Sequence, residues 1–221
     1  MTGPAVLFEA CVESVVDAVS AERGGAARVE LCVDLAVDGL TPSAEMIRDS
    51  CRALTIPVMV LVRPRAGDSH YSAEEIDGMI GDIERIKSHG AAGVVIGVLD
   101  ADLEVDRAAM ARLIKAARPM SVTFHRAFDA VRDRSVALET LVTLGVDRVL
   151  TSGGAVSAEA GIDALRELVG QASGRIGVLA GGGIRPANVA RIVEGTGVRE
   201  VHAHTPAPDL VAALSRLSRR S

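Results

Sequence analysis

The stretch SVTFHRAFD, residues 121–129, shows how the whole chain is organised. Its first four residues are typical of the end of a buried β-strand, and His125, Arg126 and Asp129 follow within five positions. Ionisable side chains directly after an apolar strand are costly to bury without partners or a task. In α/β folds the carboxyl end of a strand is where ligands bind. The alternative is a solvated loop whose charges cap the next helix.

The same arrangement recurs on both sides of this stretch, because short apolar runs alternate with amphipathic segments. The apolar runs are continuous rather than alternating, which is typical of parallel strands covered on both faces. We expect strands at residues 5–10, 28–32, 57–62, 93–98, 121–125, 148–150, 175–180 and 199–202. We expect helices at residues 14–23, 42–54, 73–87, 106–117, 135–144, 157–172, 186–194 and 209–217.

Eight such strand–helix units predict an α/β protein of the (β/α)8 TIM barrel type, with residues 1–221 as a single domain. A doubly wound open sheet is the alternative, but it would need fewer strands or a flanking domain. Helix boundaries carry local signals as well. Thr41 before Pro42 predicts an N-cap, Ser72 with Glu75 predicts a capping box, and Gly145 predicts a helix end.

Composition restricts the function. Hydrophobic residues make up 48% of the chain and aromatic residues only 2%, with no Trp, so the core must consist of Val, Leu, Ile and Ala. A net charge of -5 and so few aromatics argue against nucleic-acid binding. No apolar run is long enough to span a bilayer, and no signal peptide is visible. We therefore expect a cytoplasmic protein, whose three Cys are free thiols or metal ligands rather than disulfides.

Two of the expected strands end with the same pattern, Glu9-Ala10-Cys11 and Glu30-Leu31-Cys32. A spacing of two places Glu and Cys on the same face of a strand, and neighbouring strands lie about 4.8 Å apart. The thiols of Cys11 and Cys32 would then be close enough to share a soft ion, and thiolates favour Cu(I) and Zn. The alternative is simple burial, since Cys is among the most buried residue types.

Several other groups point to an anion site at the same end of the barrel. Residues 181–183 are all Gly and precede Ile184, Arg185 and Pro186, where we expect a helix to begin. Backbone N–H groups beside a helix N-terminus bind anions; a tight turn that needs Gly is the alternative. Arg63 and Arg65 follow the third strand and would either hold a carboxylate or phosphate, or pair with Glu9 and Glu30.

Taken together, these stretches resemble the copper homeostasis protein CutC family. The resemblance runs from about residue 6 to residue 204, and TFHRAFD with RPRAGDSHYS is its most specific part. The motifs are FEAC at 8–11, RVELC at 28–32, RPRAGDSHYS at 63–72, TFHRAFD at 123–129, RVLTSGG at 148–154, AGGGI at 180–184 and EVH at 200–202.

The resemblance implies a cytoplasmic (β/α)8 barrel that forms a homodimer or higher homo-oligomer and has a role in copper homeostasis. It also implies that Cys11 and Cys32 match the cysteines put forward as Cu(I) ligands. The sequence departs from the family at Leu103, where members often carry Gly, and after residue 202, where many have a longer tail.

Two classes of function follow, with copper ion or a small anionic molecule as the partner. One is a metal-binding protein that holds Cu(I) between Cys11 and Cys32. The other is an enzyme acting on a small anionic or phosphorylated substrate, with His125 as acid or base. The catalytic candidates beside His125 are Glu9, Glu30 and Asp129, and the substrate-binding candidates are Arg63, Arg65, Thr151, Gly182, Gly183 and His202.

Overall fold

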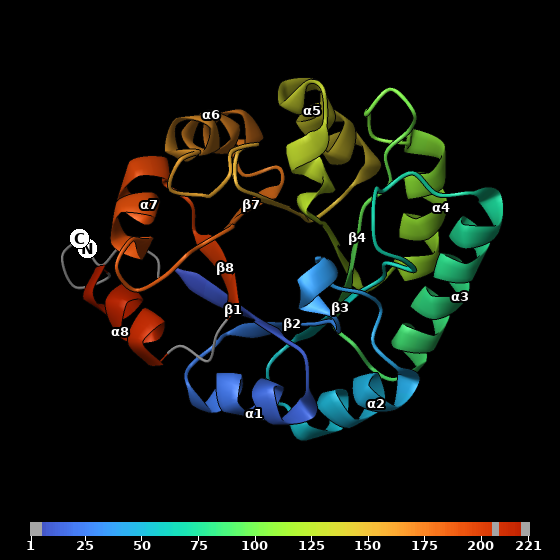
Figure 1. Ribbon diagram of the computed structural model, residues 1–221, viewed down its shortest axis with the longest axis horizontal. Helices are drawn as coiled ribbons and strands as arrows, with labels where there is room; N and C mark the ends of the chain where they lie inside the picture. The colour runs from blue at the N-terminus through green and yellow to red at the C-terminus, as the bar shows by residue number, and fades with distance from the viewer. Residues whose placement is uncertain (1–5, 205–207, 218–221) are drawn as a thin grey trace.

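The computed structural model describes residues 6–204 and 208–217. Eight parallel strands close into a barrel in sequence order, and the helices form a ring around it (Figure 1). The predicted (β/α)8 barrel is therefore confirmed, and the open sheet is excluded because β1 pairs with β8. In the part of the chain that the structure describes, no helix is long and apolar enough to cross a membrane.

The elements alternate from one end of the chain to the other. The strands are β1 (Leu7–Val12), β2 (Arg28–Leu31), β3 (Val58–Leu61), β4 (Gly93–Ile96), β5 (Ser121–Phe124), β6 (Arg148–Thr151), β7 (Gly177–Gly181) and β8 (Glu200–His204). The helices are α1 (Val15–Arg23), α2 (Ala44–Ala53), α3 (Ala73–Ser88), α4 (Arg107–Ala117), α5 (Arg134–Leu144), α6 (Ile162–Ala172), α7 (Val189–Thr196) and α8 (Pro208–Leu217). Short 3-10 helices, η1 (Leu35–Val37) and η2 (Arg126–Ala130), follow β2 and β5.

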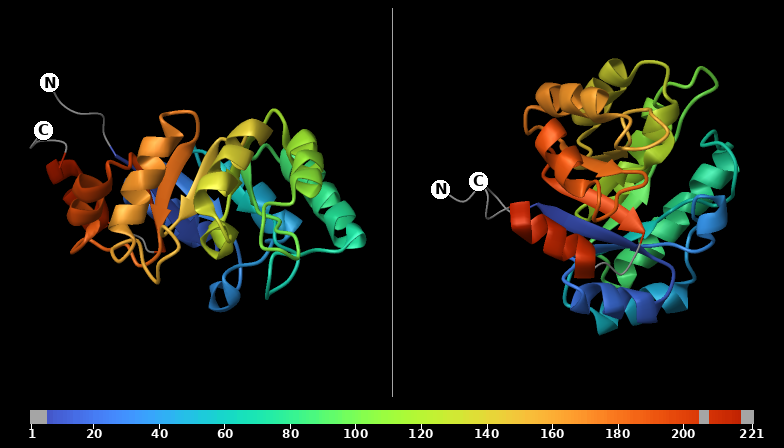
Figure 2. Two further views of the ribbon diagram at one scale, coloured as in Figure 1. Left: turned by 90° about the horizontal axis from the view of Figure 1, so that it is seen from above. Right: turned by 60° about the vertical axis from the view of Figure 1, so that its left-hand side comes forward.

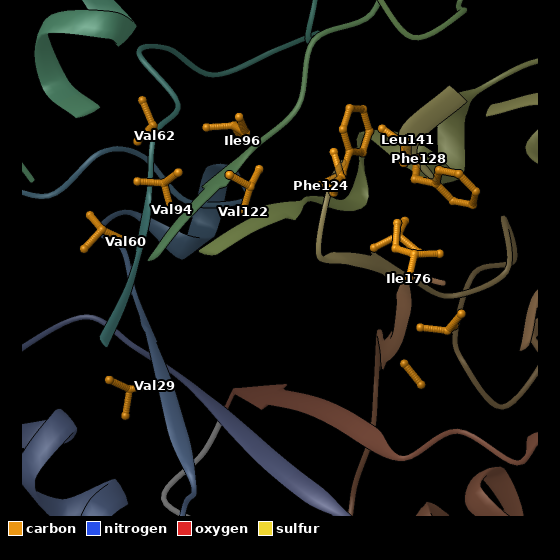
Figure 3. Packing of buried hydrophobic residues seen from close by; sticks show 14 of the residues in the cluster. Val29, Val60, Val62, Val94, Ile96, Val122, Phe124, Phe128, Leu141 and Ile176 are labelled. Atoms are coloured by element: carbon orange, nitrogen blue, oxygen red, sulfur yellow. The ribbon is translucent and has the colours of Figure 1, made fainter. Parts of the chain in front are cut away.

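Most of the hydrophobic core lies between the strands and the ring of helices. Val60, Val94 and Val122 are register partners on β3, β4 and β5, and all belong to this core (Figure 3). Successive side chains of a strand point to opposite faces. Because these valines point outward toward the helices, the residues directly before and after them on each strand point into the barrel. A smaller cluster of Cys11, Cys32, Met59, Leu61 and Val95 lies there.

Two of the three predicted helix boundaries are confirmed. Ser72 and Glu75 form a capping box, and Gly145 ends α5 with a left-handed φ of 75°. The predicted cap at Thr41 is wrong, because Ser43 accepts the N-cap hydrogen bond from Met46 N at 3.2 Å. Thr41 instead accepts from Arg63 N at 2.8 Å and ties two loops together.

Two helices, α6 and α7, begin at least three residues later than predicted. The helix expected from residue 157 begins at Ile162, because the preceding turn is held to the loop after β7 by a 2.9 Å bond from Ala158 N to Gly182 O. The helix expected from Pro186 begins at Val189. Asn188 Oδ1 accepts from Arg185 N at 2.8 Å, which closes a turn before the helix. The glycines at 181–183 are thus separated from α7 by that turn.

Candidate functional site

The carboxyl ends of the strands surround a cavity of about 750 Å³. Its lining comes from both sides of the barrel, and η1 projects at the same end (Figure 2). Cys11, Glu30, Cys32, Arg63, His125 and His202 are among the residues that line it. The structure therefore brings together side chains that are up to 193 positions apart, from Cys11 to His204.

Side chains on β8, β1 and β2 form two layers inside the barrel. In the lower layer Glu9, Glu30 and His202 bring three ligand atoms within 4.8 Å of one another. In the layer above, the Sγ atoms of Cys11 and Cys32 lie 3.5 Å apart. The repeated Glu-x-Cys pattern therefore does place both carboxylates and both thiols on the inner face.

Glu9 is fully enclosed by partners. Its side chain is 0% exposed and pairs with Arg28, while His202 Nδ1 lies 2.9 Å from its Oε1. Burial would raise the pKa of Glu9, but the hydrogen bond to His202 and the charge of Arg28 overcome it and lower the pKa to about 2. Glu9 is consequently charged at neutral pH. Arg28 continues the network to Glu200 at 2.6 Å.

Glu30 lies beside Glu9 but has few partners. It is 5% exposed, its Oε2 makes no hydrogen bond with any described residue, and the Nδ1 atom of His202 lies 3.6 Å away. Burial raises the pKa of Glu30 to about 7, with a further contribution from the charge of Glu9. Burial lowers the pKa of His202, but the charges of Glu30 and Glu9 more than compensate, so the pKa is raised.

The Cys11 thiol is protonated when no ion is bound. The bond to Cys32, burial and the charge of Glu30 all raise the pKa of Cys11. The Cys32 thiol also lies 3.8 Å from Val12 O, near the end of β1. Cys51, by contrast, lies on α2 and packs against the outer core, far from this pair in the fold.

His125 projects into the cavity from the end of β5. Its Nδ1 accepts a hydrogen bond from Ala127 N at 3.1 Å, so the neutral ring carries its proton on Nε2. That Nε2 is buried without a hydrogen-bond partner among the residues that the structure describes. Burial and the nearby charge of Arg63 lower the pKa of His125 to about 4. A Cβ at Gly97 would lie 2.5 Å from the ring, so Gly at 97 makes the space for it.

The side chains of Asp129 and Thr151 are engaged in hydrogen bonds with other residues of the protein. Asp129 accepts from Thr151 Oγ1 at 2.5 Å, from Ser152 N at 3.0 Å and from Gly154 N at 2.9 Å. Arg126 adds an ion pair at 2.9 Å. Among the described residues that line the cavity, neither Asp129 nor Thr151 appears. Their bonds order the loop after β6, so their predicted catalytic and substrate-binding roles stay predictions.

The two arginines after β3 differ in position. Arg63 is 7% exposed and lines the cavity. Arg65 pairs with Glu75 at 2.6 Å and Asp68 at 3.2 Å, lies over the Tyr71 ring, and is not among the described lining residues. Neither arginine forms an ion pair with Glu9 or Glu30 among the described residues. The predicted anion clamp therefore has one arginine at the cavity and the other bound outside it.

Gly182 and Gly183 line the opposite rim of the cavity. Their φ values of 104° and 70° are left-handed, which explains why this turn needs Gly. Both carbonyls are engaged, by Ala158 N at 2.9 Å and Asn188 Nδ2 at 3.0 Å. The backbone N–H groups of Gly182 and Gly183 are therefore the groups on this rim that are available to bind a ligand.

Arg28 and Glu200 are functional neighbours that the sequence reading missed. Arg28 stands two residues before Glu30, so the spacing that placed Glu30 inside the barrel also applied to Arg28. Arg28 helps His202 to keep Glu9 charged, and Glu200 is the second partner of Arg28. The sequence signal for Arg28 was a charged residue at the start of an otherwise apolar strand.

Fold and site define a class: a (β/α)8 barrel with a buried thiol pair above a carboxylate–histidine cluster. The sequence profile of the CutC family matches residues 6–206, and this chain belongs to the CutC family.

The relatives agree with that assignment. The copper homeostasis protein cutC homolog of Mus musculus is 48% identical over 200 residues, covering 90% of this chain and 74% of the relative. The homolog of Homo sapiens is 50% identical over 196 residues, covering 89% and 72%. A solved structure of CutC from Streptococcus agalactiae superposes with a TM-score of 0.86 at 33% identity, covering 89% of this chain and 97% of that one.

Proposed function

We propose that the protein binds Cu(I) between Cys11 and Cys32 and acts in copper homeostasis, the role for which its relatives are named. The observation that carries this proposal is the 3.5 Å separation of the two buried Sγ atoms, both of which line the cavity. Metal–thiolate bonds of about 2.3 Å, the value for zinc, let one ion bridge sulfurs up to roughly 4.6 Å apart.

The surroundings favour Cu(I) over zinc. Structural zinc sites almost always have four ligands. Among the described residues, however, the one group of three possible ligand atoms within 4.8 Å of one another comes from Glu9, Glu30 and His202, and it includes neither thiol. Glu9 is already bound by Arg28. The two thiols thus stand as a pair of soft ligands, which suits Cu(I). Binding requires a reducing compartment such as the cytoplasm and releases the thiol protons.

A competition titration against a chromophoric Cu(I) chelator under anaerobic, reducing conditions tests this proposal. We expect one Cu(I) per chain, and we expect Cys11→Ser with Cys32→Ser to abolish binding. Cys51→Ser is the matched control, because Cys51 packs against the outer core, and it should bind like the wild type. Equal loss in Cys51→Ser, or absence of binding in the wild type, would contradict the proposal.

A second candidate function is an enzyme that acts on a small anionic substrate. The observation that favours it is the pair of buried polar atoms, Glu30 Oε2 and His125 Nε2, which have no hydrogen-bond partner although both residues line the cavity. Unsatisfied buried groups of this kind are costly and concentrate at functional sites. Gly182 and Gly183 would hold a phosphate through their N–H groups.

Phosphate titration by NMR tests the glycine part of this candidate. Gly182→Val should weaken phosphate binding roughly tenfold, because a side chain at this left-handed position blocks approach to the backbone. His125→Ala should leave phosphate binding largely intact. Gly170→Ala on α6, where nothing lies within 4 Å of the added Cβ, controls for loss of a glycine. A requirement for His125 as strong as that for Gly182 would show that the cradle is misplaced.

A further inference from the structure

Arg63 carries a buried charge that the protein does not neutralise. Its guanidinium donates to three backbone carbonyls, those of Val37 at 2.6 Å, Gly39 at 2.7 Å and Gly67 at 2.9 Å. Throughout residues 6–204 and 208–217 no carboxylate lies within ion-pair distance of it, whereas the buried Arg28 has two. Carbonyl dipoles solvate the cation but leave its net positive charge at the cavity wall.

His125 adds a neutral donor to the same wall. The bond from Ala127 N to Nδ1 leaves the ring proton on Nε2, and that atom is buried with no acceptor in the described part of the chain. The pKa of about 4 means that the ring stays neutral at physiological pH. Burial and the charge of Arg63 keep the ring neutral, and Gly97 leaves the space in which the ring lies. His125 is therefore built to donate one hydrogen bond rather than to carry a charge.

We propose that this wall, made by the ends of β3 and β5, is a binding site for a small carboxylate that accepts a hydrogen bond from His125 Nε2 and faces the Arg63 guanidinium. The proposal shares the cavity of the second candidate function and rests on it only for that location, because binding requires no reaction. It assigns His125 the role of fixed hydrogen-bond donor instead of acid or base.

The donor inventory favours a carboxylate over a phosphate at this place. Three of the five N–H groups of Arg63 are already in use, and His125 contributes one more. A singly charged group with two oxygens matches that set, whereas a dianionic phosphate needs more donors. The cavity of about 750 Å³ has room for such a ligand together with a longer body.

NMR of protein labelled with ¹⁵N-histidine tests the site in the wild type, so no variant has to fold. At pH 7 the His125 signals should report the Nε2–H tautomer, and pyruvate should shift them saturably. Pyruvamide, which has the same shape without the charge, should shift them far less. An Nδ1–H or doubly protonated His125, or equal shifts with the two compounds, would overturn the proposal. A larger, saturable shift with inorganic phosphate would overturn the choice of carboxylate.

Variants then separate the hydrogen bond from the copper site. His125→Phe should weaken pyruvate binding about tenfold, the order expected for one lost hydrogen bond to a charged acceptor. His125→Gln, whose amide N–H can replace Nε2–H, should recover most of the affinity. His89→Phe is the control, because His89 lies at the C-terminal end of α3 and is not among the described residues that line the cavity. Undiminished binding in folded His125→Phe would overturn the proposal.

The Cys11→Ser/Cys32→Ser protein should bind pyruvate like the wild type even though it loses Cu(I). Loss of pyruvate binding in that protein would overturn the site as a separate one. The converse result, pyruvate binding without any Cu(I) binding by the wild type, would refute the copper proposal alone. Pyruvate binding by a wild-type protein that shows no phosphate binding at Gly182 and Gly183 would remove the support for the phosphate cradle of the enzyme candidate and leave the carboxylate site standing.

Discussion

Glu9 and Glu30 occupy the same position of a repeated Glu-x-Cys motif on neighbouring strands, yet they are in opposite electrostatic states. Both precede a cysteine by two residues and both point into the barrel. Glu9 pairs with Arg28 and His202, so its pKa falls to about 2, whereas Glu30 lacks such partners and its pKa rises to about 7. The difference shows that the repeated motif determines where each carboxylate lies, whereas its partners on the neighbouring strands determine whether it is charged.

The largest expected effect follows from removing the residue that creates this difference. Arg28→Met should lower the free energy of unfolding by about 3 to 5 kcal/mol, because it leaves the buried carboxylate of Glu9 without its arginine, while Glu200 keeps its ion pair with Arg148. Denaturant unfolding at pH 7 measures it. Arg112→Met removes the exposed pair with Asp77 and should cost less than about 1 kcal/mol. Similar costs in the two variants would mean that Arg28 does not hold Glu9.

His125 is a further buried titratable group, and it extends the comparison of Glu9 and Glu30 to another wall of the cavity. Its pKa is lowered to about 4 from an ordinary 6.5, so the unfolded chain binds more protons between these values. Stability contributed by neutral His125 should therefore be lost as the pH falls from about 6.5 to 4, by about 3 kcal/mol in total. Unfolding of His125→Gln over this range should lack that slope.

His70→Gln is the control for the pH experiment, because His70 is exposed and should keep the wild-type slope. A slope that survives unchanged in His125→Gln would show that other groups cause the acid sensitivity. It would also remove the support that the lowered pKa gives to His125 as a neutral donor.

A direct comparison of the two glutamates gives a smaller effect. At pH 6, Glu9 is ionised and Glu30 is largely protonated. Glu9→Gln should therefore lose about 1.5 to 3 kcal/mol, the range for hydrogen bonds to a charged group, and Glu30→Gln less than about 1 kcal/mol because Gln resembles the protonated acid. Denaturant unfolding of the metal-free proteins measures both. Equal losses would mean that the two sites are equivalent after all.

The smallest expected effect concerns backbone strain at the rim of the cavity. Leu103 has a φ of 59° and its side chain is 48% exposed. The left-handed conformation costs a residue with a Cβ roughly 1 to 2 kcal/mol, and Gly loses part of that gain through its freer unfolded chain. Leu103→Gly should thus raise stability by about 0.5 kcal/mol in denaturant unfolding. A loss above about 1 kcal/mol would show that the side chain contributes more than the strain costs.

Much of the fold could be predicted because it depends on local patterns. The continuous apolar strands, the capping box at Ser72 and the end of α5 at Gly145 follow from side-chain chemistry within a few residues. The late starts of α6 and α7 could not be predicted, because bonds to the loop after β7 and within the turn at Asn188 replace the first helical turn. Thr41 does not cap α2 for a similar reason, because its side chain accepts a hydrogen bond from the backbone N of Arg63 in the loop after β3.

For the candidate site, the chain itself determined which side chains share the barrel interior, since a spacing of two on a parallel strand places Glu9 with Cys11 and Glu30 with Cys32. Only the tertiary structure decided what each of them does. Arg28 and His202 hold Glu9 charged, Ala127 and Arg63 keep His125 neutral, and the loop after β6 takes up Asp129. Burial strengthens every such interaction, and the partners come from strands and loops that only folding brings together.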